Sequence, residues 1–112
     1  MTVITDEFMM GMLSKTKAYT LVLLKSGPNN QHPEMKSLIW EHVRRNFTLR
    51  KEGLLSVVTP VSDETDLKGM GIFNADIEQT RHLMEQDPCV QAGIFTFEIH
   101  PTRSFPGDLL PA

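Results

Sequence analysis

The sequence predicts an α+β domain in which four strands form one antiparallel sheet and two helices cover one face of it. Apolar segments rich in β-favouring residues and segments of helical periodicity follow one another in the order strand, helix, strand, strand, helix, strand. The 112 residues are enough for one hydrophobic core but not for two. A composition of 40% hydrophobic and 22% charged residues is ordinary for a globular domain.

The first strand is predicted at residues 19–25, a nearly continuous apolar run. Turn-forming residues then lead to a helix over residues 33–52, which Gly53 ends. At roughly 100° per residue, the apolar residues of this helix are expected to form one stripe. Its predicted members are Met35, Leu38, Ile39, Val43, Phe47 and Leu49.

The second and third strands are predicted at residues 54–59 and 69–73, joined by a polar hairpin loop. The glycines of the third strand indicate a close approach of backbone or ligand. Asn74 and Asp76 offer caps for a second helix, and Asp87 ends that helix because a residue before proline is pushed out of the α region.

The fourth strand is predicted at residues 93–100, where Phe95, Phe97 and Ile99 alternate with polar residues. The proline-rich residues 101–112 are expected to lack regular structure. We therefore predict a single domain over residues 1–112, with an N-terminal arm (1–17), a core (18–101) and a C-terminal tail (102–112). The Met-rich arm is expected to form a short amphipathic turn or helix that packs on a partner subunit, or else a poorly ordered leader.

The order β-α-β-β-α-β is that of the ferredoxin-like fold, in which both helices lie on one face of the sheet. The opposite face would then be uncovered and too apolar to remain in water. We expect two copies of the chain to pair through these faces as a homodimer that closes into an α/β barrel.

Charge and composition exclude several classes of protein. A net charge of −3 argues against a nucleic-acid-binding surface, and the Arg44–Arg45 and Arg50–Lys51 pairs are interpreted as a solvated helix face. No apolar run is long enough to span a membrane, and a cytoplasmic location is predicted. The single cysteine, Cys89, excludes an intrachain disulfide and is interpreted as a small packing residue.

His42 is the strongest functional candidate because it projects into the middle of the apolar stripe of the first helix. A buried imidazole needs partners for both ring nitrogens, and a carboxylate on another element would supply one of them. Asp87 is the expected partner, since both helices lie on the same face of the sheet. Such a pair is suited to general acid–base catalysis near neutral pH. The alternative is a satisfied core histidine and an aspartate that caps a loop.

Two further polar residues are candidates for ligand binding. Asn46, one turn after His42, would contact a ligand or satisfy the core between helix and sheet. Lys25 would attract an anionic substrate, or is simply an exposed lysine. No spacing of histidine, cysteine or carboxylate residues predicts a metal site, and no phosphate-binding loop or other cofactor motif is present.

Several segments resemble the YCII-related family, and together the resemblance covers residues 18–101. The segments are 41–53, 58–60, 85–93 and 97–101, of which Asp87-Pro-Cys-Val-Gln-Ala-Gly93 is the most specific. The resemblance implies a dimeric ferredoxin-like α/β barrel in which a His–Asp dyad acts, carried over here to His42 and Asp87. One branch of the family resembles a dehydrochlorinase of chlorinated hydroxylated aromatics, and relatives with the same barrel include isomerases and monooxygenases.

The chain departs from the family pattern at two positions. Thr59 stands where the family has the glycine of a Gly-Pro pair, which changes the loop near the pocket and offers a hydroxyl to a substrate. Cys89 replaces the phenylalanine of Asp-Pro-Phe and reduces the local packing volume.

Two functions are compatible with these residues. The first is a small-molecule enzyme of lyase or isomerase type that uses His42 and Asp87 for proton transfer on an unidentified small cyclic substrate. The alternative is a non-catalytic dimeric module that binds a small molecule or regulates another process, with the dyad as a polar anchor.

Overall fold

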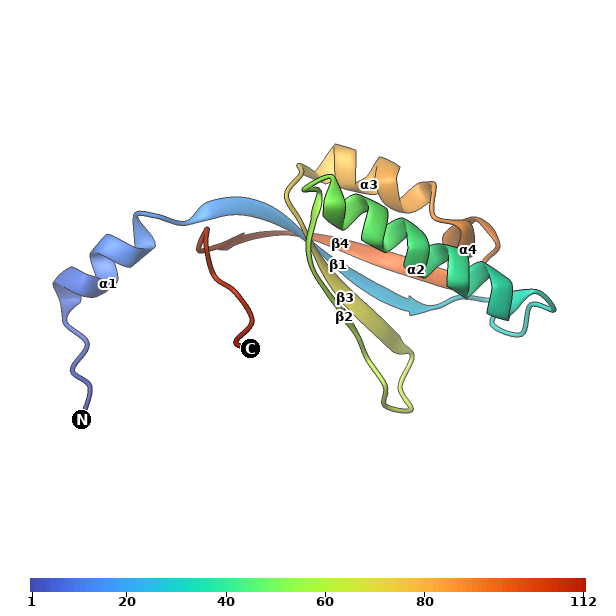
Figure 1. The fold of residues 1–112 in the computed structure, drawn as a ribbon, viewed down its shortest axis with the longest axis horizontal. Helices are drawn as coiled ribbons and strands as arrows, with labels where there is room; N and C mark the ends of the chain where they lie inside the picture. Colours follow the sequence, from blue (N-terminus) through green and yellow to red (C-terminus); the bar gives the residue numbers. More distant parts are fainter.

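The computed structural model describes residues 1–112 and contains one four-stranded antiparallel sheet in the order β2-β3-β1-β4 (Figure 1). This architecture confirms the predicted α+β, ferredoxin-like fold. In chain order the elements are α1 (Asp6–Leu13), β1 (Lys17–Ser26), α2 (Met35–Lys51), β2 (Leu55–Pro60), β3 (Leu67–Phe73), α3 (Ile77–Glu85), α4 (Pro88–Gln91) and β4 (Phe95–Ser104).

One face of the sheet is covered by α2, α3 and α4, which all lie on the same side of the strands (Figure 1). Val22 in the central strand β1 points to this face, where it pairs in register with Gly71 of β3 and Ile99 of β4. The hydrophobic core lies between the two layers. Its buried members are Val22, Leu49, Leu55, Phe73 and Met84.

No element of the chain covers the other face of the sheet (Figure 1). Leu21 pairs with Ile72, and Leu23 pairs with Met70, so these four side chains share this open face. All four are only partly buried. Pairing of two copies through the open face stays a prediction, as does the cytoplasmic location. None of the helices combines the length and apolar character needed to cross a bilayer.

The strands β1 and β4 extend further than predicted. β4 continues through Pro101 to Ser104 and pairs with residues 17–20 of β1. The expectation that residues 101–104 lack regular structure was wrong. Pro101 is accommodated because β4 is an edge strand, where a missing N–H need not break a ladder between two neighbours.

The predicted stripe of α2 divides into two. Leu49 is 5% exposed, whereas Val43 and Phe47 are 36% and 61% exposed. Phe47 is five residues from His42, which rotates it by about 140° around the helix axis. The arc that faces the sheet therefore ends at Val43, which lies at its edge, and Phe47 lies with Trp40 on the outer side of α2.

Candidate functional site

A cavity of about 210 Å³ lies between α2 and the sheet. His42 and Asn46 of α2 line one wall, and apolar residues of the strands, among them Val22, Leu24 and Phe95, line the others. The side chain of His42 is 12% exposed and that of Asp87 is 2% exposed. Asp87 is not part of the lining, so His42 stands between this carboxylate and the cavity.

Two glycines of β3 form the floor of the cavity. Gly69 and Gly71 pair with Leu24 and Val22, whose side chains face the helices, so a side chain at either glycine would enter the same layer. A Cβ atom at Gly71 would lie 3.2 Å from Cδ1 of Leu55 and 3.3 Å from Cε2 of Phe73. The absence of side chains at these two positions leaves this part of the cavity open, and the approach of a ligand to them stays a prediction.

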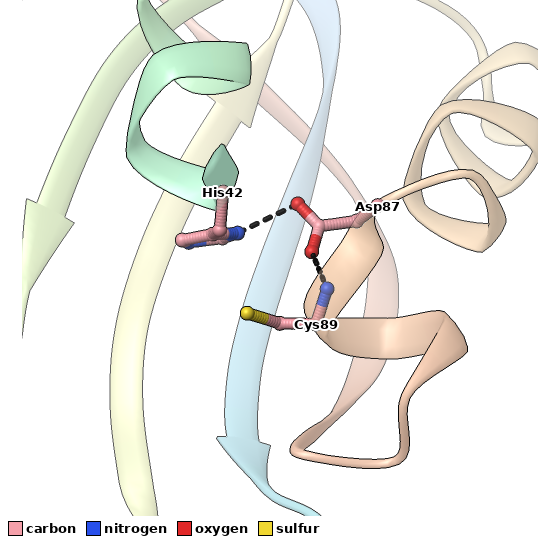
Figure 2. Close-up of side chains that lie close together, drawn as sticks. All are labelled: His42, Asp87 and Cys89. Carbon is pink, nitrogen blue, oxygen red and sulfur yellow. Dashed lines mark hydrogen bonds and ion pairs between the residues drawn. The ribbon is translucent and has the colours of Figure 1, made fainter. Parts of the chain in front are cut away.

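His42 and Asp87 form the closest side-chain pair at this site. Nδ1 of His42 lies 2.6 Å from Oδ2 of Asp87, and Figure 2 shows the imidazole pointing toward this carboxylate. An ionised carboxylate only accepts hydrogen bonds, so Nδ1 carries the proton and donates a hydrogen bond to Asp87. Nε2 is then the acceptor nitrogen, and Nδ2 of Asn46 lies 3.3 Å from it. The ring edge of Phe95 packs against the imidazole with a centroid separation of 5.3 Å.

Asp87 is held in place by a helix that the sequence interpretation missed. Its backbone is extended at φ −67° and ψ 132°, as expected before a proline, and it caps the short helix α4. Oδ1 accepts hydrogen bonds from the N–H groups of Cys89 at 2.9 Å and Val90 at 3.4 Å. Asp-Pro was the available signal, because aspartate at the N-cap and proline at the first helical position both favour a helix start.

Arg45 is a second residue that sequence analysis did not identify. Its Nη1 lies 3.9 Å from Oδ2 of Asp87, and its side chain is 21% exposed. The interpretation of Arg45 as part of a solvated face was therefore incomplete. Its position three residues after His42 was the signal, because residues at i and i+3 lie on the same side of a helix. The guanidinium therefore lies within ion-pair distance of the Asp87 carboxylate.

The other predicted binding residues lie at different distances from this pair. Thr59 lines the cavity at its β2 side, and its register with Met70 assigns its side chain to the open face of the sheet. Lys25 does not line the cavity. It lies at the end of β1, and its Nζ is 3.2 Å from Oε2 of Glu98 on the neighbouring strand.

Cys89 completes a cluster with His42 and Asp87 in which one donor atom from each lies within 4.8 Å of the others. The thiol is fully buried, and desolvation, followed by the charge of Asp87, raises its pKa to about 11. Both carboxylate oxygens and Nδ1 of His42 already have hydrogen-bond partners, and Arg45 places a positive charge nearby. A cation would have to displace these contacts, so the cluster is better suited to fixing the imidazole than to holding a metal.

No protein-family model matches the chain, and no curated protein matches it. Among solved structures, it is similar to 5-chloro-2-hydroxyhydroquinone dehydrochlorinase from Burkholderia phenoliruptrix, determined in complex with 2,5-dihydroxybenzoquinone. The TM-score is 0.56 at 20% sequence identity, over 73% of this chain and 90% of that chain. At this identity the similarity concerns the fold alone.

Proposed function

We propose that this protein is a YCII-like small-molecule enzyme in which His42 transfers a proton to and from a substrate bound in the cavity. The observation that carries the proposal is the 2.6 Å contact between Nδ1 of His42 and Oδ2 of Asp87 at the cavity wall. The contact lies within the 2.6–3.2 Å range of working acid–base pairs. The imidazole borders open space on one side and a buried carboxylate on the other.

In this mechanism Nε2 of His42 accepts a proton from the substrate. Asp87 holds the ring in the tautomer that leaves Nε2 unprotonated, and it stabilises the imidazolium after the transfer. Arg45 and the N–H groups of Cys89 and Val90 hold the carboxylate in position. General base catalysis of this kind typically contributes about 10²–10⁴ in rate.

The cavity favours a small ring-shaped substrate. Its volume of about 210 Å³ lies below the roughly 300–1,000 Å³ of sites for drug-sized ligands, and most of its lining is apolar. The structural neighbour is a dehydrochlorinase, and we propose the same class of chemistry for this chain. Nε2 would take a proton from a hydroxylated ring, the electron pair released would expel chloride, and the substrate would lose HCl overall. Asn46 would contact the substrate through its side chain, and Thr59 would do so through its backbone at the cavity wall.

We further propose that the working form is a homodimer. The open face of the sheet carries the apolar residues Leu21, Leu23, Met70 and Ile72 and lacks a cover within the chain. A second copy supplies a self-complementary cover through a two-fold interface.

Ligand binding to the cavity is tested by nuclear magnetic resonance with 2,5-dihydroxybenzoquinone as the probe. The four histidines give resolvable ring signals. The signal that is lost in the His42→Gln variant is the signal of His42. We expect saturable shifts of the His42 signal, with the signal of His100 unchanged because His100 pairs with Leu21 on the open face. Binding without any shift of His42 would contradict the assignment of the cavity as the ligand site.

Turnover separates the enzyme from a binding module. Loss of activity in His42→Gln, with the fold retained, supports acid–base catalysis. Saturable binding without chemical change across hydroxylated and chlorinated ring compounds would instead favour the non-catalytic module.

A further inference from the structure

The N-terminal helix α1 has no packing partner within its own chain. None of its residues is buried, and Phe8, Met10 and Leu13 are 56%, 66% and 59% exposed. Figure 1 shows α1 at one end of the molecule, beyond the ribbon formed by the ends of β1 and β4. The radius of gyration is 16.5 Å, whereas a compact domain of this length has about 13 Å.

A helix as short as α1 needs an external surface to remain folded. Eight residues are below the roughly 12–15 at which an isolated helix becomes marginally stable in water. The hydroxyl of Thr5 accepts a hydrogen bond from the N–H of Phe8 at 3.1 Å, and such a cap contributes only about 1 kcal/mol. Exposed apolar residues on a capped helix indicate a docking element.

The outer side of α2 offers a matching surface. Trp40, Val43 and Phe47, which we call the outer stripe, are 65%, 36% and 61% exposed. They follow one another at intervals of three and four residues and so form a continuous ridge. Shallow grooves lie along this ridge, one of them lined by Trp40, Val43 and Phe47 together with Arg44 and Lys51.

The charges of the two helices are complementary. The first turn of α1 contains Asp6 and Glu7, and the helix has no basic residue. The sequence of α2 contains one acidic residue, Glu41, and five basic ones. The basic residues are Lys36, Arg44, Arg45, Arg50 and Lys51. Three of these, Lys36, Arg44 and Lys51, line the grooves beside the outer stripe. Opposite charges at the rim of an apolar contact favour the pairing of α1 with α2 over the pairing of two copies of the same helix.

We propose that α1 of one copy of the chain binds the outer stripe on α2 of a second copy. Figure 1 places α1 and α2 apart along the longest axis of the molecule, so the stripe of the same copy lies away from α1. A reciprocal exchange between two copies closes the assembly with two-fold symmetry. Val43 lines both the outer groove and the cavity beside His42, so the docked helix lies at the rim of that cavity.

Trp40 is the only tryptophan of the chain and reports directly on this contact. In the full-length wild type we expect blue-shifted emission and weak quenching by acrylamide, because α1 of the other copy covers the indole. Phe8→Glu should shift the emission to the red and increase the quenching constant severalfold. This variant keeps the helix, because Thr5 and a glutamate three residues later form a capping box. The matched control is Leu110→Glu, an equally drastic change at an exposed tail residue, which should behave as wild type.

A mixed assembly tests whether the contact joins two copies. Phe47→Glu disrupts the stripe but retains Trp40, so alone it should resemble Phe8→Glu. Co-expression of the two variants pairs an intact α1 with an intact stripe, and about half of the protection of Trp40 in the Phe8→Glu copies should return. The proposal is overturned if acrylamide quenches Trp40 of the wild type as readily as Trp40 of Phe8→Glu. This result would contradict it whether α1 stays unbound or binds another protein. It is also overturned if the mixed assembly regains no protection. Neither result bears on proton transfer by His42.

Discussion

Oδ2 of Asp87 lies 2.6 Å from Nδ1 of His42, although 45 residues separate them in the sequence. The same carboxylate caps α4 through Oδ1. Asp87 therefore contacts the imidazole and caps the helix α4 at once. Its role as the catalytic partner of His42 stays a prediction. Variants that separate the two roles are available.

Asp87→Asn should retain the cap while changing the tautomer of His42. The amide oxygen can accept the hydrogen bonds from Cys89 and Val90, which leaves the amide NH₂ facing Nδ1. Nδ1 then has to accept, and the ring proton moves to Nε2. We expect a loss of stability below about 1.5 kcal/mol, with the proton found on Nε2 by ¹⁵N nuclear magnetic resonance. A proton that remains on Nδ1 would show that Asp87 does not set the tautomer.

Asp87→Ala removes both roles and serves as the comparison. It loses the cap, at about 1 kcal/mol, and leaves a buried donor on His42 without a partner, at about 1–3 kcal/mol. Urea unfolding should therefore show a loss of about 2–4 kcal/mol. Equal stability of Asp87→Ala and Asp87→Asn would indicate that the cap contributes little.

Gly71→Ala should fill part of the cavity floor. Its new methyl group would meet Cδ1 of Leu55 and Cε2 of Phe73, which are side-chain atoms that can shift. We expect at least about a tenfold loss of affinity for 2,5-dihydroxybenzoquinone, equivalent to about 1.4 kcal/mol. Isothermal titration calorimetry measures this affinity. Ile72→Val, on the opposite face of the same strand, is the control and should bind as wild type; equal affinities for Gly71→Ala and Ile72→Val would place the ligand elsewhere.

Cys89 should make the protein less stable at high pH. Burial raises the pKa of its thiol from 9.0 to about 11. Between these values the unfolded chain has lost the proton that the folded chain keeps, so the free energy of unfolding falls as pH rises. The loss should reach about 2 kcal/mol between pH 8 and pH 11. Urea titrations of wild type and Cys89→Ala isolate this contribution, which the variant should lack; parallel pH profiles for the two proteins would exclude it.

Leu21→Lys tests the proposed dimer interface. Leu21 pairs with Ile72 on the open face, where a partner copy would bury the new ammonium group. Sedimentation velocity should show a dimer for wild type and association at least about 100-fold weaker for the variant, equivalent to about 2.7 kcal/mol. Glu78→Lys, an exposed substitution on α3, should leave the dimer intact. A wild-type monomer would contradict the interface.

The sequence was sufficient for the fold and for the approach of His42 to Asp87, because both depend on periodicity and topology. A histidine inside an apolar helical arc must find buried partners, and the βαββαβ order brings the end of α3 beside α2. The glycines of β3 were expected to permit a close approach of backbone or ligand, and the structure places both of them along the cavity.

Other features depended on three-dimensional packing. The apolar residues of α2 fell into two arcs, and only the position of the sheet decides which arc is buried and which carries Trp40 and Phe47. The end of β4 became regular because the N-terminal end of β1 extends to pair with it, a nonlocal interaction. Lys25 follows a residue of β1 whose side chain faces the cavity, so its own side chain points to the other face of the sheet. Its ion pair with Glu98 lies on that face.

Chloride release from 5-chloro-2-hydroxyhydroquinone, compared between wild type and His42→Gln, tests the central claim most directly. Glutamine preserves much of the size and polarity of the side chain but cannot act as a base near neutral pH. Removal of the base should lower kcat by about 10²–10⁴, while circular dichroism remains unchanged. A wild-type rate no greater than that of His42→Gln would contradict proton transfer by His42.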